Sequence, residues 1–185
     1  MFGLKERKRV DEKPFNAVKH DLKTMNKKDV TGRATLCYIF KHDKVLLQLK
    51  NIKKFGGGKW NAPGGKLKEG ETPEEGVIRE VFEETGLQIK KPNLRGKIFF
   101  VFAENGEYNQ EVYIFYANSF SGKEKANEEG ELKWFGQNSI PIEKMWPDDK
   151  YWLPIFLQGK KFTAKFYFDS YGSQKITKYE INEGL

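Results

Sequence analysis

The chain has 185 residues, 38% of them hydrophobic and 15% aromatic, with a formal net charge of +7. This length and composition are typical of one folded domain with a sizeable core, and they exclude a disordered or fibrous protein. No apolar run approaches the length of a membrane span, and no signal peptide is expected at the N-terminus. The single cysteine, Cys37, excludes an internal disulfide framework and favours a cytoplasmic location.

Positive charge is concentrated in residues 1–30, which carry nine Lys or Arg and five Asp or Glu. A basic balance attracts nucleotides and nucleic acids alike, so charge does not choose between these partners. We interpret residues 1–30 as a solvated basic arm, with room for a short helix near residues 16–25. Residues 31–185 are then the folded domain.

From Arg33 onward, apolar runs separated by turn residues indicate strands. A glycine-rich loop, residues 51–59, lacks the Gly-Lys-Ser/Thr of a P-loop, so we interpret it as a flexible turn. An Asn105-Gly106 turn is expected between two central strands, and residues 121–131 are expected to be a charged loop. Strands are expected at residues 34–40, 45–50, 97–104, 111–118, 132–135, 161–168 and 174–181, and a second helix at 149–158.

The clearest helix is predicted over residues 73–85. Thr72 is a good N-cap, Pro73 suits the first helical position, and Glu75 completes a capping box. Gly86 then supplies the C-terminal stop. The helix should bury one apolar side and leave an acidic side facing outward.

That acidic side carries Glu80, Glu83 and Glu84, which helical spacing brings within one arc. Carboxylates held so close repel one another unless a cation lies among them, and the adjacent Arg79 is too little to neutralise three. Magnesium prefers a few carboxylates together with substrate phosphates. On spacing alone, a solvated acidic face explains the pattern equally well.

The longer string that ends in this helix resembles the Nudix hydrolase family, whose members cleave a diphosphate linked to a group X. Gly65, Glu71 and the run Arg79-Glu80-Val81-x-Glu83-Glu84-x-Gly86-Leu87 match the fixed positions of the Nudix box. The resemblance implies an α+β Nudix fold, an α/β/α sandwich with a mixed sheet and a loop-helix-loop catalytic motif. It also implies bound Mg²⁺, with Mn²⁺ as a possible substitute.

The same resemblance assigns roles to residues in and near the box. The implied metal ligands are Gly64, through its carbonyl, with Glu80, Glu83, Glu84 and Glu129; the implied catalytic residues are Arg79, Glu83, Glu84 and Glu129. Arg79 would orient the glutamates, and Glu71 would brace the loop. Glu129 fits an ordinary acid in a charged run equally well, and whether Glu83 or Glu129 is the general base stays open.

A second motif, Trp146-Pro147-Asp148-Asp149, concerns the group X. An indole can stack on a purine, and carboxylates can accept hydrogen bonds from the N–H groups of its pairing edge. Adjacent buried acids can also share a proton, so that one of them donates. A helix cap beside core aromatics is the alternative from these residues alone.

Residues 34–179 resemble the MutT-like members of the family that hydrolyse oxidised purine nucleoside triphosphates. In that pattern Trp146 stacks on the base, and Asp148 and Asp149 read its edge. Further pocket positions are Asn61, Lys50, Thr35, Phe55, Phe100 and Phe102. Ala62-Pro63 and Gly130 depart from the pattern, so the preferred oxidised purine stays open.

The resemblance thus implies a monomeric, magnesium-dependent enzyme that converts an oxidised purine nucleoside triphosphate to the monophosphate and pyrophosphate. Such an enzyme sanitises the nucleotide pool. One alternative is removal of pyrophosphate from RNA 5′ ends, with the basic arm holding RNA. Another is a non-catalytic module that senses nucleotides, although the intact glutamate set argues against it.

Overall fold

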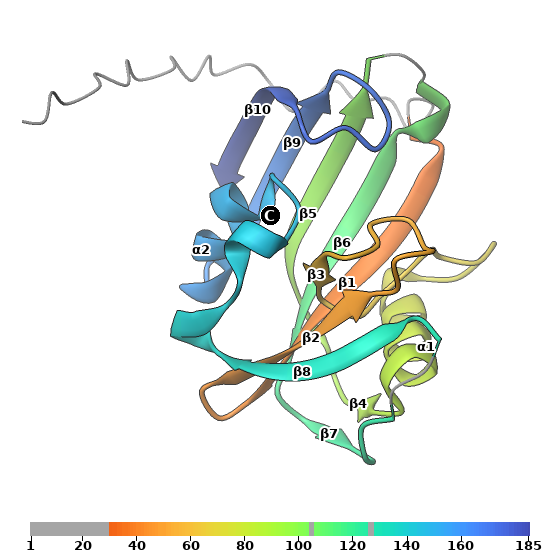
Figure 1. Ribbon diagram of the computed structural model, residues 1–185, viewed down its shortest axis with the longest axis vertical. Helices are drawn as coiled ribbons and strands as arrows, with labels where there is room; N and C mark the ends of the chain where they lie inside the picture. The colour runs from red at the N-terminus through yellow and green to blue at the C-terminus, as the bar shows by residue number, and fades with distance from the viewer. Residues whose placement is uncertain (1–29, 104–105, 126–127) are drawn as a thin grey trace, which may run out of the picture.

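A computed structural model describes residues 30–103, 106–125 and 128–185 of the chain. The helix expected near residues 16–25 and Asn105 of the expected turn lie outside these residues. The described part contains an eight-stranded mixed sheet in the order β10-β9-β5-β6-β1-β2-β3, with β8 pairing to β2 (Figure 1). The strands are β1 Gly32–Lys41, β2 Lys44–Lys50, β3 Trp60–Asn61, β4 Gln88–Ile89, β5 Asn93–Phe102, β6 Gln110–Ala117, β7 Phe120–Ser121, β8 Gly130–Gly136, β9 Phe162–Phe168 and β10 Ile176–Glu183; the helices are α1 Pro73–Thr85 and α2 Asp149–Leu157, with short 3₁₀ turns η3 Gly106–Tyr108, η4 Gln137–Ser139 and η5 Ile142–Lys144.

The sheet lies between two apolar cores, one under each helix. Side chains of β1 alternate between them, with Cys37 packing in the core under α1 and Tyr38 in the core under α2. α1 contributes Val77 and Val81 to its core, and α2 contributes Trp152 to the other. The expected α+β sandwich with a mixed sheet is therefore confirmed.

Helix α1 has the predicted bounds because its ends are specified by adjacent residues. The Thr72 hydroxyl accepts a hydrogen bond from the Glu75 N–H at 3.3 Å, and the Glu75 carboxylate accepts one from the Thr72 N–H at 2.9 Å. Gly86 ends the helix with a φ of +73°, a conformation that costs glycine little. These contacts fix where the glutamate-bearing helix starts and stops.

Other boundaries differ from expectation where pairing is non-local. β5 begins at Asn93, earlier than the expected residue 97, and the predicted loop at residues 121–131 is wrong at both ends. At one end Phe120–Ser121 pairs with Gln88–Ile89, and at the other Gly130 pairs with Lys50 of β2. Because the partner strands lie far away in sequence, local patterning does not indicate these short strands.

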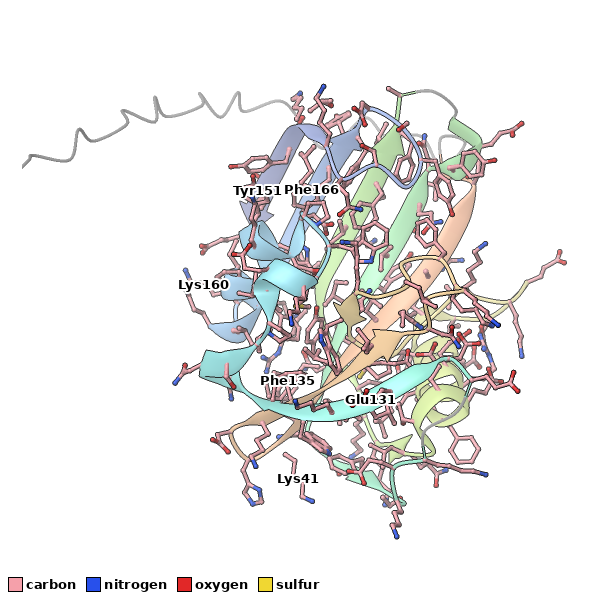
Figure 2. The ribbon with its side chains drawn as sticks, viewed as in Figure 1. Lys41, Glu131, Phe135, Tyr151, Lys160 and Phe166 are labelled. Atoms are coloured by element: carbon pink, nitrogen blue, oxygen red, sulfur yellow. The ribbon has the colours of Figure 1, made fainter. Side chains whose placement is uncertain are left out.

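The C-terminal hairpin extends the sheet beyond β5. Strands β9 and β10 form the predicted antiparallel hairpin around Tyr171, and β9 pairs in parallel with β5. Tyr151 of α2 packs on Phe166 of β9 with ring centroids 6.2 Å apart, and Figure 2 shows the two side chains close together. This packing fixes the start of α2, which carries the Asp148–Asp149 pair, against the sheet.

Candidate active site

The loop before α1 is docked on the edge of β1 near the centre of the sheet. The Thr35 N–H donates to the Gly65 carbonyl at 2.9 Å, and the Cys37 N–H donates to the Pro63 carbonyl at 2.8 Å. A Cβ at Gly64 would overlap the carbonyl of Thr35, so only glycine permits this close approach. The loop therefore presents its backbone at a defined position beside the helix.

Arg79 holds the acidic side chains of this region together. Its guanidinium donates two hydrogen bonds to Glu71, both at 2.7 Å, one to Glu80 at 2.6 Å and one to Glu83 at 3.0 Å. A fifth hydrogen bond, at 3.1 Å, goes to the carbonyl of Lys66 in the loop. Hydrogen bonds from Arg79 hold the pKa of Glu71 at about 2. Arg79 thus connects the loop to the helix and orients two of the glutamates.

Glu84 faces inward and has different partners. One of its oxygens accepts a hydrogen bond from the Gly64 N–H at 2.9 Å, and the other lies 2.5 Å from Nζ of Lys50. Burial raises the pKa of Glu84, and the Lys50 charge opposes that rise. Lys50 is therefore the counter-ion of a buried glutamate as well as a residue of the expected base pocket.

The donor chemistry of this region fits a hard divalent cation. Glu80, Glu83 and Glu84 offer carboxylate oxygens along one side of α1, and the docked loop adds backbone carbonyls. A Cβ at Gly65 would lie 2.5 Å from a Glu80 carboxylate oxygen, so the missing side chain makes room for Glu80 against the loop. Within the described ranges, no three acidic side chains converge as a metal's ligands would, because Arg79 holds Glu80 and Glu83 while Lys50 holds Glu84.

Glu129 has hydrogen-bond partners different from those of Glu80, Glu83 and Glu84. It accepts a hydrogen bond from Nζ of Lys54 at 2.9 Å, and its backbone carbonyl accepts one from the Asn51 N–H at 2.9 Å. Both partners belong to the glycine-rich loop. The structure therefore places Glu129 beside that loop, and its role as a metal ligand or base stays a prediction.

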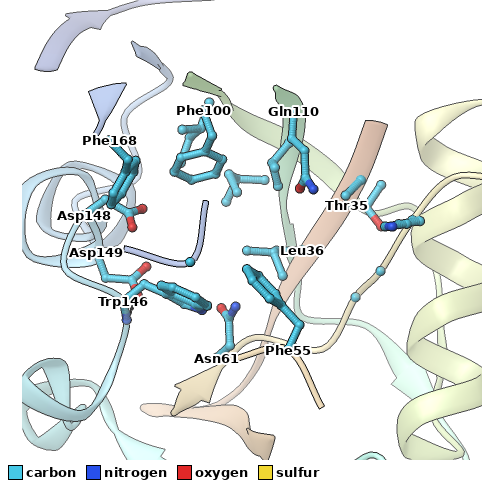
Figure 3. A pocket seen from close by; sticks show the side chains of 18 of the residues that line it. Thr35, Leu36, Phe55, Asn61, Phe100, Gln110, Trp146, Asp148, Asp149 and Phe168 are labelled. Carbon is cyan, nitrogen blue, oxygen red and sulfur yellow. Dashed lines mark hydrogen bonds between the residues drawn. The ribbon is translucent and has the colours of Figure 1, made fainter. Parts of the chain in front are cut away.

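A cavity of about 300 Å³ opens between the sheet, the start of α2 and the docked loop (Figure 3). The predicted pocket residues come from strands β1, β2, β3 and β5, the glycine-rich loop and the start of α2. All of them line this one cavity, as does Gly64 of the docked loop: Thr35, Lys50, Phe55, Asn61, Phe100, Phe102, Trp146, Asp148 and Asp149. A cavity of this size with an apolar wall and a few polar groups is typical of a small-molecule site.

The two aspartates form the polar end of the cavity. Asp149 accepts a hydrogen bond from the Trp146 N–H at 2.8 Å, and Asp148 accepts one from the Trp152 indole N–H at 3.0 Å. Burial raises the pKa of Asp148 to about 6, while burial and the Asp148 charge together raise the pKa of Asp149. The pair therefore favours a state in which it retains a proton, with both a donor and acceptors available.

Two other pocket residues, Asn61 and Thr35, have polar side-chain groups that a ligand could contact. Asn61 accepts a hydrogen bond from the adjacent Ala62 N–H at 2.8 Å through its side-chain oxygen, which leaves the amide NH₂ as its donor. The Thr35 hydroxyl is buried and has no hydrogen-bond partner among the described residues. An unpartnered buried hydroxyl in a cavity wall is suited to a ligand or an ordered water.

Sequence reasoning missed several residues of the site. Lys50 was expected as a pocket residue but not as the partner of Glu84, because no sequence signal links positions on different elements. Tyr171, Gly172 and Ser173 of the β9–β10 turn also line the cavity, as do Gln110 and Phe168. Their turn and strand patterns predict secondary structure and do not indicate which face meets a ligand.

The NUDIX domain family matches residues 30–156 of the chain. The chain belongs to the Nudix hydrolase family. The oxidized purine nucleoside triphosphate hydrolase of Mus musculus is 40% identical over 149 residues, covering 80% of this Nudix chain and 93% of that protein. The Danio rerio protein of the same name is 37% identical with the same coverage. The crystal structure of a mutator MutT protein from Bacillus halodurans superposes with a TM-score of 0.72 at 30% identity, covering 82% of this chain and 97% of that one.

Membership makes the protein a Nudix pyrophosphohydrolase, and enzymes of this family generally use a divalent metal ion. Its substrate is a small molecule of the nucleotide type. None of the helices in the described residues is long and apolar enough to span a membrane.

Proposed function

We propose that this Nudix enzyme hydrolyses oxidised purine nucleoside triphosphates to the monophosphate and pyrophosphate, in a reaction that depends on Mg²⁺. The observation that carries the proposal is the single cavity shared by two kinds of residue. Trp146, Asp148 and Asp149 line one end, while Lys50 and Gly64, the two partners of Glu84, line the other. The Mus musculus and Danio rerio relatives, which bear the name of this activity, support it.

The base end explains how an oxidised purine is selected. A purine can stack on the Trp146 indole, and its pairing edge then meets Asp148 and Asp149. Because the pair retains a proton, it can donate to a base oxygen and accept from a base N–H at the same time. Oxidation changes the donors and acceptors on a purine, so a polar site of this kind discriminates where an apolar one does not.

At the phosphate end, Glu80, Glu83 and Glu84, together with the carbonyl of Gly64, would hold Mg²⁺. A metal bound there neutralises phosphate charge and lowers the pKa of a bound water. Arg79 keeps Glu80 and Glu83 on one side of the helix and fixes the loop through Lys66. Lys50 lines the cavity beside Glu84, where its ammonium can contact a phosphate or sugar oxygen once Glu84 has another cationic partner.

A pyrophosphate-release screen with Mg²⁺ tests the proposal. It should span oxidised and normal purine triphosphates, ADP-ribose, capped dinucleotides and triphosphorylated RNA. We expect 8-oxo-dGTP or 2-hydroxy-dATP to have the highest kcat/KM, with monophosphate and pyrophosphate as the products. A preference for ADP-ribose or triphosphorylated RNA would overturn the substrate assignment. Replacing Mg²⁺ by Mn²⁺ in the same assay tests the metal.

A further inference from the structure

Four aromatic side chains from four separate segments form a stack at the cavity. Trp146, just before α2, stacks on Phe55 of the glycine-rich loop with ring centroids 5.2 Å apart. Phe55 in turn stacks on Tyr171 of the β9–β10 turn at 5.0 Å, and Tyr171 stacks on Tyr108 of η3 at 4.2 Å. The stack connects the proposed base-stacking indole to the glycine-rich loop, the β9–β10 turn and η3, none of which belongs to the Nudix box.

Among the described residues, Tyr171 contacts more aromatic rings than any other member of this stack. Besides Phe55 and Tyr108, it meets Phe102 edge-on at 5.3 Å, and it lines the cavity itself. Its turn is closed by a hydrogen bond from the Ser173 N–H to the Ser170 carbonyl at 3.2 Å and by Gly172 at a φ of +78°. A turn anchored in this way can hold the ring in a defined place.

Phe55 depends on this neighbour. It is 58% exposed, so its side chain packs little against its own loop, in which the next residue, Gly56, has a positive φ. Its ring contacts among the described residues are with Trp146 and Tyr171. Removing the Tyr171 ring would leave Phe55 with Trp146 alone.

We propose that Tyr171 is a positioning residue of the base pocket. Its ring closes the cavity beside Phe102 and holds Phe55 against Trp146, so that the base enters a preorganised aromatic wall. This role rests on the proposed function, because it assumes that a base occupies the cavity. The ring of Tyr171 packs on Phe55, Phe102 and Tyr108 at the base pocket, so we expect it to affect base affinity and to leave the chemical step unchanged.

The test compares Y171A with Y171F and with Y179A as a matched control. Tyr179 is 42% exposed, close to the 38% of Tyr171. Its ring is tilted against Tyr151 at 4.5 Å and stacks on Phe166 at 5.8 Å, and it does not line the cavity. For the best oxidised purine triphosphate, we expect Y171A to raise KM about five- to tenfold, as the loss of one aromatic contact allows. We expect its kcat to stay within about twofold of the wild type, as a uniform loss of binding requires.

Y171F keeps the ring and should restore the wild-type KM, and Y179A should leave KM unchanged. Calorimetric binding of the product monophosphate should show the same weakening in Y171A, and Y171L serves as a second ring-free variant should Y171A fold poorly. A KM for the ring-free variants equal to that of Y179A would overturn the proposal, as would a loss confined to kcat.

Failure of the proposed function has a different result. In that case the wild type itself would hydrolyse another nucleotide in preference to oxidised purines. The comparison of ring-free and control variants is then made with that nucleotide, so the role of Tyr171 is still decided.

Discussion

The carboxylates of α1 and those of the Asp148–Asp149 pair are stabilised in opposite ways. The aspartates line the cavity, whereas Glu84 of α1 contacts it through the lining residues Lys50 and Gly64. Glu80, Glu83 and Glu84 are each matched by a cationic side chain, either Arg79 or Lys50. The aspartates have no salt bridge of this kind among the described residues, and burial raises their pKa values instead. The first group can exchange one cation for another, whereas the second retains a proton and reads hydrogen-bond donors and acceptors.

The largest predicted effect is at the α1 end. Replacing Glu84 by Gln should lower kcat by about 10³-fold, because the amide loses the charge that a metal-activated water needs. The amide oxygen can still accept the Gly64 N–H, so folding should persist. Steady-state kinetics and nucleotide binding check this, with E74Q, at an exposed first-turn position, as the control. Unchanged turnover in E84Q would contradict the catalytic assignment.

A smaller and different effect is expected at the aspartate end. D149N can still accept the Trp146 N–H, but the pair can no longer combine a carboxylate with a neutral acid. KM for an oxidised purine triphosphate should rise about tenfold or more, since a buried polar group of the site then lacks its match. D43N, in the exposed β1–β2 turn, is the control. A fall in kcat with an unchanged KM would contradict the assignment of base binding to the aspartates and of catalysis to the glutamates of α1.

Lys50 connects the two regions, and its removal should be seen in stability. K50M leaves Glu84 buried without its counter-ion, and losing one partner of a buried pair costs about 3 kcal/mol. The melting temperature in EDTA should fall by about 5 °C or more, and Mg²⁺ should restore part of the loss. K160M, which breaks the exposed Lys160–Glu183 pair, is the control and should change little. Equal melting temperatures for the two variants would mean that Lys50 is not the counter-ion of Glu84.

The pH dependence of stability sharpens the comparison further. Because the native pKa of Asp148 is raised to about 6 from an unfolded value near 4, its contribution is fully present below pH 4 and is lost as the pH rises through 6. D148N removes this titration. Relative to D148N, the wild type should therefore lose unfolding free energy as the pH rises from 4 to 7. Parallel pH profiles from denaturant unfolding would contradict the raised pKa.

The two regions also differ in how far the sequence predicts them. The α1 end is largely encoded in one contiguous stretch, where Thr72, Glu75 and Gly86 specify the helix and fixed spacing sets the glutamates. The Glu84–Lys50 pair escaped prediction because it joins a helix to a strand 34 residues away. Local sequence carries no signal for that contact.

The residues of the base pocket cannot be identified from the local sequence pattern alone. Taken alone, Trp146, Asp148 and Asp149 favour a helix cap beside core aromatics, and only the family resemblance indicates a pocket. Tyr171 had no signal at all, since a tyrosine before a glycine predicts a turn and nothing more. The short strand β7 was missed for the same reason, because its pairing with β4 depends on tertiary contacts, whereas a strand start at residues 88–90 was expected from the sequence.

A crystal structure with Mg²⁺ and a non-hydrolysable analogue of 8-oxo-dGTP tests the central claim most directly. The account predicts metal on Glu80, Glu83 and Glu84, with Lys50 released from Glu84. It also predicts the base stacked on Trp146 with its edge at Asp148 and Asp149. A nucleotide bound outside the cavity, with the glutamates still held by Arg79 and Lys50, would contradict it.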